Sequence, residues 1–194
     1  MRLIPAAHAW ATNGDLIADV ASLYLRDSDA VLDATYGRGL WWTRWQPARL
    51  CTNDLFVEAE FSHDFRNMPF HDGEFDAVAF DPPYKLNGSP SLGDFDNRYG
   101  VQVPTRWQDR MQIILDGLEE CARVASRVVL AKCQDQVCSG QIRWQTFELE
   151  NLGFQLGLSL TDRFDMLGGS RSQPEGRRQV HARNRPSTLL VFTK

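Results

Sequence analysis

The sequence predicts an α/β protein whose sheet is mainly parallel and ends in an antiparallel hairpin. Three observations support this class. Short apolar runs alternate with amphipathic segments along the 194 residues, two of the early runs finish in carboxylates, and the last two apolar runs predict adjacent closing strands. No internal repeat or linker interrupts this order. We therefore expect a single domain over residues 1–194.

The first half of the chain predicts a helix, a strand and a glycine-rich turn, then two more strands. The helix is expected over residues 15–25, where apolar side chains recur at helical spacing: Leu16, Ile17, Val20, Leu23 and Tyr24. AVLDATYGRG then predicts a strand that enters the turn, and LWWTRWQPA predicts a brief helix ended by Pro47. RLCTNDLF predicts a strand ending near Asp54. FDAVAFDPPY predicts a buried strand that stops at Pro82, because proline cannot donate to a strand ladder.

The second half begins with a long loop, KLNGSPSLGDFDNRYGVQVP, whose four glycines and two prolines show no sustained period. A helix is expected over residues 106–125, followed by the strand RVVLAKC and a helix over residues 141–152. The segments GFQLGLSLTDRF and PSTLLVFTK predict the two closing strands.

Overall charge argues against a protein that coats nucleic acid through bulk electrostatics, because the net charge is −4 and the pI is about 5.6. The charges are unevenly spread, however. The stretch from Arg163 to Lys194 holds seven basic residues and two acidic ones. A solvated loop and a surface that faces a polyanion both fit this pattern.

The sequence contains no run of 18 apolar residues and no signal-peptide pattern, so we expect a cytoplasmic protein without a membrane partner. Its four cysteines lack CxxC spacing and its four histidines lack metal-ligand spacing. We therefore expect reduced thiols and no metal. A GxSxG elbow, which a serine hydrolase would need, is also absent.

Four suggestive groups are expected near the carboxyl ends of the strands, where open α/β sheets bind ligands: the DATYGRG turn, Asp54, Asp64 and the tetrapeptide DPPY. Gly37 and Gly39 of DATYGRG would let backbone amides approach a ligand closely, and the helix after them would offer its N-terminus. Asp54, about 20 residues after the turn, could accept both hydroxyls of a ribose or simply form a turn. Asp64 could accept from an adenine amino group or cap a helix.

The tetrapeptide Asp81-Pro82-Pro83-Tyr84 follows the buried strand. Its prolines fix the backbone so that a carbonyl and the Asp81 carboxylate meet at one point, and Tyr84 supplies an aromatic face. Such a site suits a planar ring with an amino group. Two acceptors that bind the amino hydrogens localise the nitrogen lone pair, so the nitrogen can attack an electrophile.

On these motifs the chain, from about residue 29 to residue 194, resembles the class I S-adenosylmethionine-dependent methyltransferases that methylate adenine N6 or cytosine N4 in DNA. The resemblance implies a Rossmann-like fold, S-adenosylmethionine as cofactor and a bacterial or phage-encoded protein. It also implies that the helix from Asp15 covers the methionine part of the cofactor. The implied cofactor-binding residues are Asp33, Ala34, Tyr36, Gly37, Gly39, Asp54, Leu55, Asp64 and Phe65, and the implied catalytic residues are Asp81, Pro82 and Tyr84.

The chain departs from this family at two places. It reads Asp33-Ala34-Thr35-Tyr36 where many members have Asp-Pro-Phe, and it leaves no room for a separate target-recognition domain. Recognition is therefore expected from the loop after DPPY and from the basic segment 168–185. The expected nucleic-acid contacts are Lys85, Arg98, Arg171, Arg177, Arg178, Arg183 and Arg185.

The expected function is methyl transfer to adenine N6 in DNA. Two alternatives stay open: an RNA base methyltransferase acting on guanine N2 or adenine N6, and a catalytically silent protein that uses the fold as a binding platform. Cytosine C5 methylation is disfavoured, because it requires a cysteine nucleophile in a Pro-Cys turn and this chain reads Lys132-Cys133-Gln134. The oligomeric state is not indicated.

Overall fold

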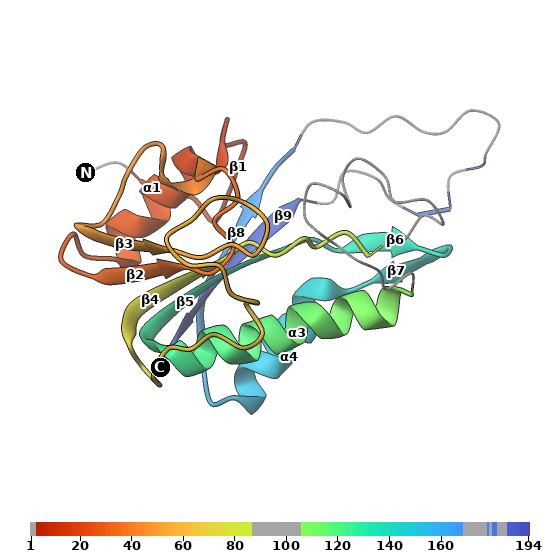
Figure 1. Cartoon of the computed structure of the whole chain (residues 1–194). Helices are drawn as coiled ribbons and strands as arrows, with labels where there is room; N and C mark the ends of the chain where they lie inside the picture. Colours follow the sequence, from red (N-terminus) through yellow and green to blue (C-terminus); the bar gives the residue numbers. More distant parts are fainter. Residues whose placement is uncertain (1–2, 87–105, 169–177, 179, 182–185) are drawn as a thin grey trace.

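The computed structural model describes residues 3–86, 106–168, 178, 180–181 and 186–194. Within them the chain forms a twisted seven-stranded sheet in the order β1-β8-β9-β5-β4-β2-β3 (Figure 1). Strand β9 runs antiparallel to β5 and β8, and the other pairs are parallel, so the predicted fold class is confirmed. The strands are β1 (Ala7–His8), β2 (Ala30–Asp33), β3 (Arg49–Thr52), β4 (Phe75–Phe80), β5 (Ala125–Cys133), β8 (Ser159–Met166) and β9 (Ser187–Thr193).

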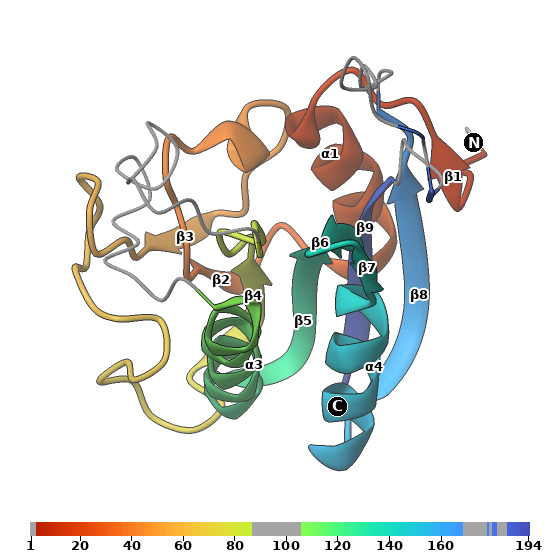
Figure 2. The same ribbon diagram turned by 90° about the vertical axis from the view of Figure 1, so that its right-hand side faces the viewer.

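Helices cover both faces of the sheet, as Figure 2 shows. Helix α1 (Asn13–Tyr24) and the short 3-10 helix η1 (Leu40–Trp42) pack on one face. Helices α3 (Trp107–Val124) and α4 (Gln145–Gln155) pack on the other. The central strands are therefore buried on both sides, which explains why the strand sequence FDAVAF is apolar at nearly every position.

The order of the strands fixes where a ligand can bind. From β2 the chain goes first to β3 on one side and then to β4 on the other side, so the strand order reverses between β2 and β4. Crevices in open α/β sheets form at this point, beyond the carboxyl ends of the strands. Asp33 is paired with Ala79 in the β2–β4 register, which brings Asp33 close to the residues that follow β4.

Helix α1 begins two residues before the predicted position, because Thr12 caps it. The Thr12 hydroxyl accepts a hydrogen bond from the Asp15 amide at 3.1 Å and donates one to the Asp15 carboxylate at 2.7 Å. This reciprocal pair satisfies an amide that the first helical turn leaves without a partner.

The helix predicted for LWWTRWQPA is wrong. Only Leu40–Trp42 is helical, as a single 3-10 turn that Gly39 enters with a φ of +66°. The indoles of Trp41 and Trp42 donate hydrogen bonds to the carboxylates of the half-buried Asp81 and the buried Asp33, and these bonds compete with a regular amphipathic helix. The helix N-terminus expected after the glycine-rich turn is therefore replaced by this short turn.

The helix predicted for residues 141–152 is shifted. Residues Gln141–Arg143 form strand β7, which pairs with β6 (Gln136–Cys138), and α4 starts only at Gln145. Ser139 and Gly140 form the turn with φ values of +52° and +74°, as a two-residue hairpin requires.

Other boundaries differ by a few residues. Strand β3 ends at Thr52 instead of near Asp54, and residues 153–155, expected in a strand, complete α4 before β8 begins at Ser159. The sequence analysis also missed β1, which pairs with β8 through only two residues. Among the described residues, no helix is long and apolar enough to cross a membrane. All four cysteines are buried as free thiols.

Gly117 of α3 provides a test of this packing. A Cβ at Gly117 would lie 2.6 Å from ring atoms of both Phe65 and Phe80. Alanine gains about 1 kcal/mol in helix propensity, but overpacking a core costs about 1–3 kcal/mol. We expect Gly117→Ala to lower the free energy of unfolding by about 1 kcal/mol in urea denaturation, whereas Glu119→Ala, at an exposed position of the same helix, should change it little. Increased stability of Gly117→Ala would contradict this packing.

Candidate active site

A cavity of about 1020 Å³ opens at the carboxyl ends of β2 and β4. It lies at the position that the strand order predicts for a ligand. The cavity wall brings together most of the residues that the sequence analysis selected: Asp33, Ala34, Tyr36, Gly37, Asp54, Leu55, Asp64, Phe65, Asp81, Pro82, Tyr84 and Lys85.

The two glycines of DATYGRG differ in what they contribute. Both have a left-handed backbone, with φ of +55° at Gly37 and +66° at Gly39. A Cβ at Gly37 would meet only the Thr35 carbonyl oxygen, at 3.9 Å, so the space beside Gly37 is open. A Cβ at Gly39 would lie 2.6 Å from the Tyr36 hydroxyl. Gly39 therefore makes room for the Tyr36 ring and does not line the cavity.

Asp54 is already engaged with the backbone around it. One carboxylate oxygen accepts from the Gly37 amide at 2.8 Å, and the other accepts from the Phe56 and Val57 amides at 2.9 and 3.0 Å. A carboxylate has about four acceptor positions, so roughly one is left for a ligand. Asp54 was expected to accept hydrogen bonds from two ribose hydroxyls. Its remaining acceptor position leaves room for one such bond, beside the hydrogen bond from the Gly37 amide that holds the turn.

Asp64 lies on the cavity wall but is paired with Arg66. The guanidinium donates to both carboxylate oxygens, at distances down to 2.5 Å, and the Arg66 amide donates to one of them at 3.0 Å. Hydrogen bonds from Arg66 lower the pKa of Asp64. Residues 65–74, between Asp64 and β4, contain no helix, so Asp64 does not cap one.

Asp33 is 4% exposed at the end of β2. Its carboxylate accepts from the Trp42 indole at 2.6 Å and from the Thr35 amide at 3.1 Å. Burial raises the pKa of Asp33 to about 7, although both hydrogen bonds act in the opposite direction and the nearby Asp81 and Asp54 raise it further. Asp33 therefore exchanges a proton near neutral pH.

Asp81 is held from two sides. Its amide donates to the Thr35 hydroxyl at 2.8 Å, and its Oδ2 accepts from the Trp41 indole at 2.9 Å. Its Oδ1 is buried and has no hydrogen-bond partner among the residues that the structure describes. Burial raises the pKa of Asp81, while the Lys132 ammonium and the Trp41 indole act to lower it. A residue of the cavity wall thus keeps one buried acceptor atom to which no described residue donates.

The backbone after Asp81 is fixed by two glutamines. The Tyr84 carbonyl accepts from Gln136 Nε2 at 2.6 Å and from Gln145 Nε2 at 3.2 Å, and the Leu86 amide donates to Gln136 Oε1 at 3.1 Å. The Arg110 guanidinium donates to the Lys85 carbonyl at 3.2 Å. These bonds tie the DPPY segment to the β6–β7 hairpin and to both α3 and α4.

Sequence reasoning missed the side chains that hold the acidic groups. The adjacent tryptophans after DATYGRG could have indicated nearby acceptor groups, because a buried indole N–H requires an acceptor. Gln136, Gln145 and Lys132 lie 50 or more residues beyond the acidic motifs, and no local pattern connects them. Only the folded chain brings them together.

Of the expected nucleic-acid contacts, Lys85 lies on the cavity wall and Arg178 is exposed. Arg98, Arg171, Arg177, Arg183 and Arg185 lie outside the described residues. The segment between β8 and β9 leaves the sheet after Met166 and returns at Ser187. Because β8 is parallel to β4 and β5, both ends of this segment lie at the carboxyl edge, where Asp81 is found.

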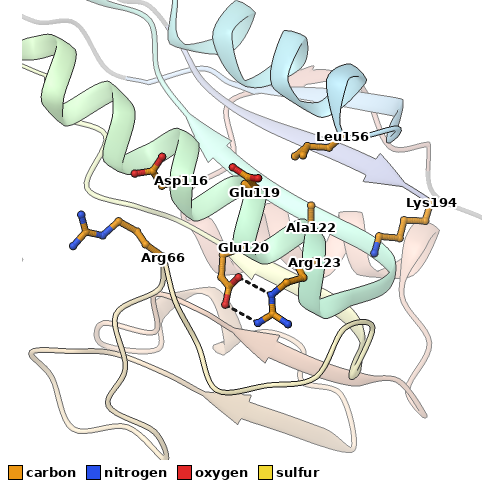
Figure 3. A pocket seen from close by; sticks show the side chains of 8 residues that line it. All are labelled: Arg66, Asp116, Glu119, Glu120, Ala122, Arg123, Leu156 and Lys194. Atoms are coloured by element: carbon orange, nitrogen blue, oxygen red, sulfur yellow. Dashed lines mark hydrogen bonds and ion pairs between the residues drawn. The ribbon is translucent and has the colours of Figure 1, made fainter.

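A second hollow of about 500 Å³ lies along α3 (Figure 3). Several of its charged side chains are used for internal contacts. Glu120 accepts from the Met68 amide at 2.6 Å and from Arg123, and Arg123 also donates to Asp72. Lys194 donates to the Ala125 carbonyl. These bonds stabilise the loop before β4, and the hollow contains none of the groups that DATYGRG and DPPY contribute.

No protein-family model and no curated protein matches this sequence. Among solved structures, a candidate RNA methyltransferase from Pyrococcus horikoshii superimposes with a TM-score of 0.56 and 14% identity, covering 93% of this chain and 82% of that one. The chain has the class I methyltransferase fold.

Two weaker likenesses fall below a TM-score of 0.5. An S-adenosylmethionine-dependent methyltransferase from Methanosarcina mazei gives 0.49 at 11% identity, over 90% of this chain and 96% of that one. A Burkholderia thailandensis 1,6-didemethyltoxoflavin-N1-methyltransferase with bound S-adenosylhomocysteine gives 0.48 at 12% identity, over 94% and 76%.

The raised pKa of Asp33 predicts how stability depends on pH. Between about pH 4 and pH 7 the folded protein binds a proton at Asp33 that the unfolded chain has lost, so this group stabilises the fold at low pH and stops doing so as the pH passes 7. We expect the free energy of unfolding to fall by on the order of 1 kcal/mol per pH unit approaching pH 7. Urea denaturation of the wild type and of Asp33→Asn checks this. The variant should show a flatter dependence, and identical slopes would contradict the raised pKa.

Proposed function

We propose that this protein transfers a methyl group from S-adenosylmethionine to an exocyclic amino group of a nucleic-acid base, and that the substrate is adenine N6 in DNA. The observation that carries the proposal is the buried Oδ1 of Asp81, which has no hydrogen-bond partner among the described residues and belongs to a residue that lines the same cavity as Tyr84 and Gly37. An acceptor without a donor, at the end of a strand in a methyltransferase fold, suits a ligand that brings an N–H group.

The cavity suits the cofactor in size and charge. Ligand pockets generally measure about 300–1,000 Å³, and this cavity is of that size. Asp33, Asp54 and Asp81 supply carboxylates at its wall, which favour a cationic ligand. The open space beside Gly37 allows close approach to the backbone, and the remaining acceptor position of Asp54 suits one hydroxyl. When bound, S-adenosylmethionine supplies an electrophilic methyl group.

The residues after β4 suit the acceptor base. Asp81 Oδ1 would accept a hydrogen bond from the amino group and so localise the lone pair on the attacking nitrogen. Trp41 keeps Oδ2 occupied, which leaves Oδ1 for the substrate. Tyr84 would stack on the base, and the glutamines bound to its carbonyl fix the backbone that carries the ring.

DNA and RNA present the same amino groups, and the choice between them rests on groups outside the cavity. A base taken out of a duplex loses stacking energy, and phosphate contacts are the available compensation. We assign these contacts to Lys85 and Arg178, together with Arg98 and the arginines of segment 168–185. The Pyrococcus horikoshii structure, described as a candidate RNA methyltransferase, keeps an RNA base as the second possible substrate.

Nucleoside analysis by mass spectrometry tests the proposed substrate. DNA and RNA from cells that express the protein should be digested and compared with nucleic acids from cells that express Asp81→Ala. We expect N6-methyladenine in DNA only with the wild-type protein. Methylated bases in RNA alone would replace DNA by RNA as the substrate, and methylation of neither would contradict the proposed function.

Asp81→Ala also tests the role of the free acceptor in the purified protein. Removal of a positioned acceptor generally lowers a rate by a factor on the order of 10² or more, whereas cofactor binding should change little. The matched control is Asp27→Ala, because Asp27 also accepts from an indole, that of Trp45 at 3.2 Å, but is exposed and lies outside the cavity. Radiolabelled methyl transfer at the wild-type rate by Asp81→Ala would overturn the mechanism.

A further inference from the structure

Lys132 is a buried cation at the same edge of the sheet as Asp81. It is the penultimate residue of β5 and is 2% exposed. In the β4–β5 register Phe80 is paired with Ala131, so Asp81 and Lys132 follow side by side on neighbouring strands. Burying an ammonium group costs several kcal/mol unless nearby groups compensate, so its place beside Asp81 requires an explanation.

The contacts of Lys132 leave its charge without a direct ion pair. Its ammonium donates to the side-chain oxygen of Asn13, the first residue of α1. Within the part of the chain that the structure describes, no carboxylate lies within ion-pair distance of Lys132. Asp81 Oδ1 also has no partner. Lys132 and Asp81 are thus two adjacent, buried charges that act on each other through space.

The electrostatics of the two groups are reciprocal. Burial lowers the pKa of Lys132 and raises the pKa of Asp81, and in each case the charge of the other residue opposes the effect. Two other ionisable groups, Asp33 and Cys133, lie near this pair. Asp33, at the end of β2, adds negative charge near Asp81, and Cys133, next to Lys132, has a pKa raised well above its usual value and is a neutral thiol.

We propose that Lys132 is a positioning residue that keeps Asp81 an anionic hydrogen-bond acceptor, and that it thereby restricts the reacting group to one that carries an N–H donor. An ionised carboxylate only accepts hydrogen bonds, whereas a protonated one also donates. With Asp81 anionic, a carbonyl edge such as guanine O6 meets a second acceptor and is rejected, and an amino group is bound. This specificity role rests on the proposed function, but the charge coupling beneath it does not.

Carbon-13 NMR of the side-chain carboxyl groups tests the coupling in the protein without ligands. Lys132→Met keeps an unbranched side chain only one heavy atom shorter and removes its charge, and Lys132→Arg is the matched control that keeps the charge. An opposite charge at close range generally moves a carboxyl titration by about one pH unit or more. We expect the Asp81 titration midpoint to rise by that amount in Lys132→Met and to stay near the wild-type value in Lys132→Arg.

An unchanged Asp81 midpoint in folded Lys132→Met would overturn the proposal. If Lys132→Met fails to fold, the reciprocal variant Asp81→Asn tests the same charge coupling. By linkage, Asp81→Asn should lower the titration midpoint of the Lys132 ammonium by a similar amount, and an unchanged midpoint there would overturn the proposal equally. Neither measurement depends on methyl transfer, so failure of the coupling is distinguishable from failure of the proposed function.

Activity supplies the readout for the specificity role. Loss of the Lys132 charge should move the acid limb of the kcat/KM profile to higher pH by about one unit, with Lys132→Arg restoring it. At a pH above this limb, kcat/KM of Lys132→Met should recover toward the wild-type value. A uniform loss of activity at every pH would indicate that Lys132 acts only on structure, and would overturn the specificity role.

Discussion

The burial of Asp33 and Asp81 at the ends of neighbouring strands constrains the whole carboxyl edge of the sheet. A buried carboxylate is costly unless donors surround it. Two consecutive indoles meet part of this requirement, since Trp42 donates to Asp33 and Trp41 donates to Asp81. To present both indoles in this way, η1 is a single 3-10 turn, and Gly39 enters it with a left-handed backbone.

The indole donors do not fully compensate the burial of the two acidic groups. The uncompensated features of Asp81 and Asp33 make this edge of the sheet a candidate active site. Asp81 keeps one buried oxygen without a partner, and Asp33 has a pKa raised to about 7 by burial. Strongly perturbed ionisable groups that line a cavity are typical of functional sites. The neighbouring Lys132 adds a buried positive charge next to Asp81. Together these groups favour a cationic ligand and, beside it, a second molecule that carries an N–H donor.

Local sequence was sufficient for those parts of the fold that depend on short-range patterns. The apolar run before Asp81 predicted β4, and Gly37, the acids and DPPY indicated residues that line the cavity, whereas Gly39 does not line it. The helix predicted after Gly39 was wrong, because the long-range acceptors of Trp41 and Trp42 decide the conformation there. The same limit applies to Gln136 and Gln145, whose bonds to the Tyr84 carbonyl join segments more than 50 residues apart. The single acceptor position left on Asp54 could not be foreseen either, since it depends on which backbone amides turn toward the carboxylate.

The most direct test of the central claim, that the Gly37 turn holds the cofactor beside Asp81, is calorimetric titration of S-adenosylmethionine into two glycine variants. Gly37 and Gly157 both have a left-handed backbone with open space around them, but only Gly37 lines the cavity. Alanine should strain both positions to a similar degree. The account predicts that Gly37→Ala weakens binding by about tenfold or more, equivalent to ~1.4 kcal/mol, while Gly157→Ala binds like the wild type. Equal affinities in folded Gly37→Ala and Gly157→Ala would contradict it.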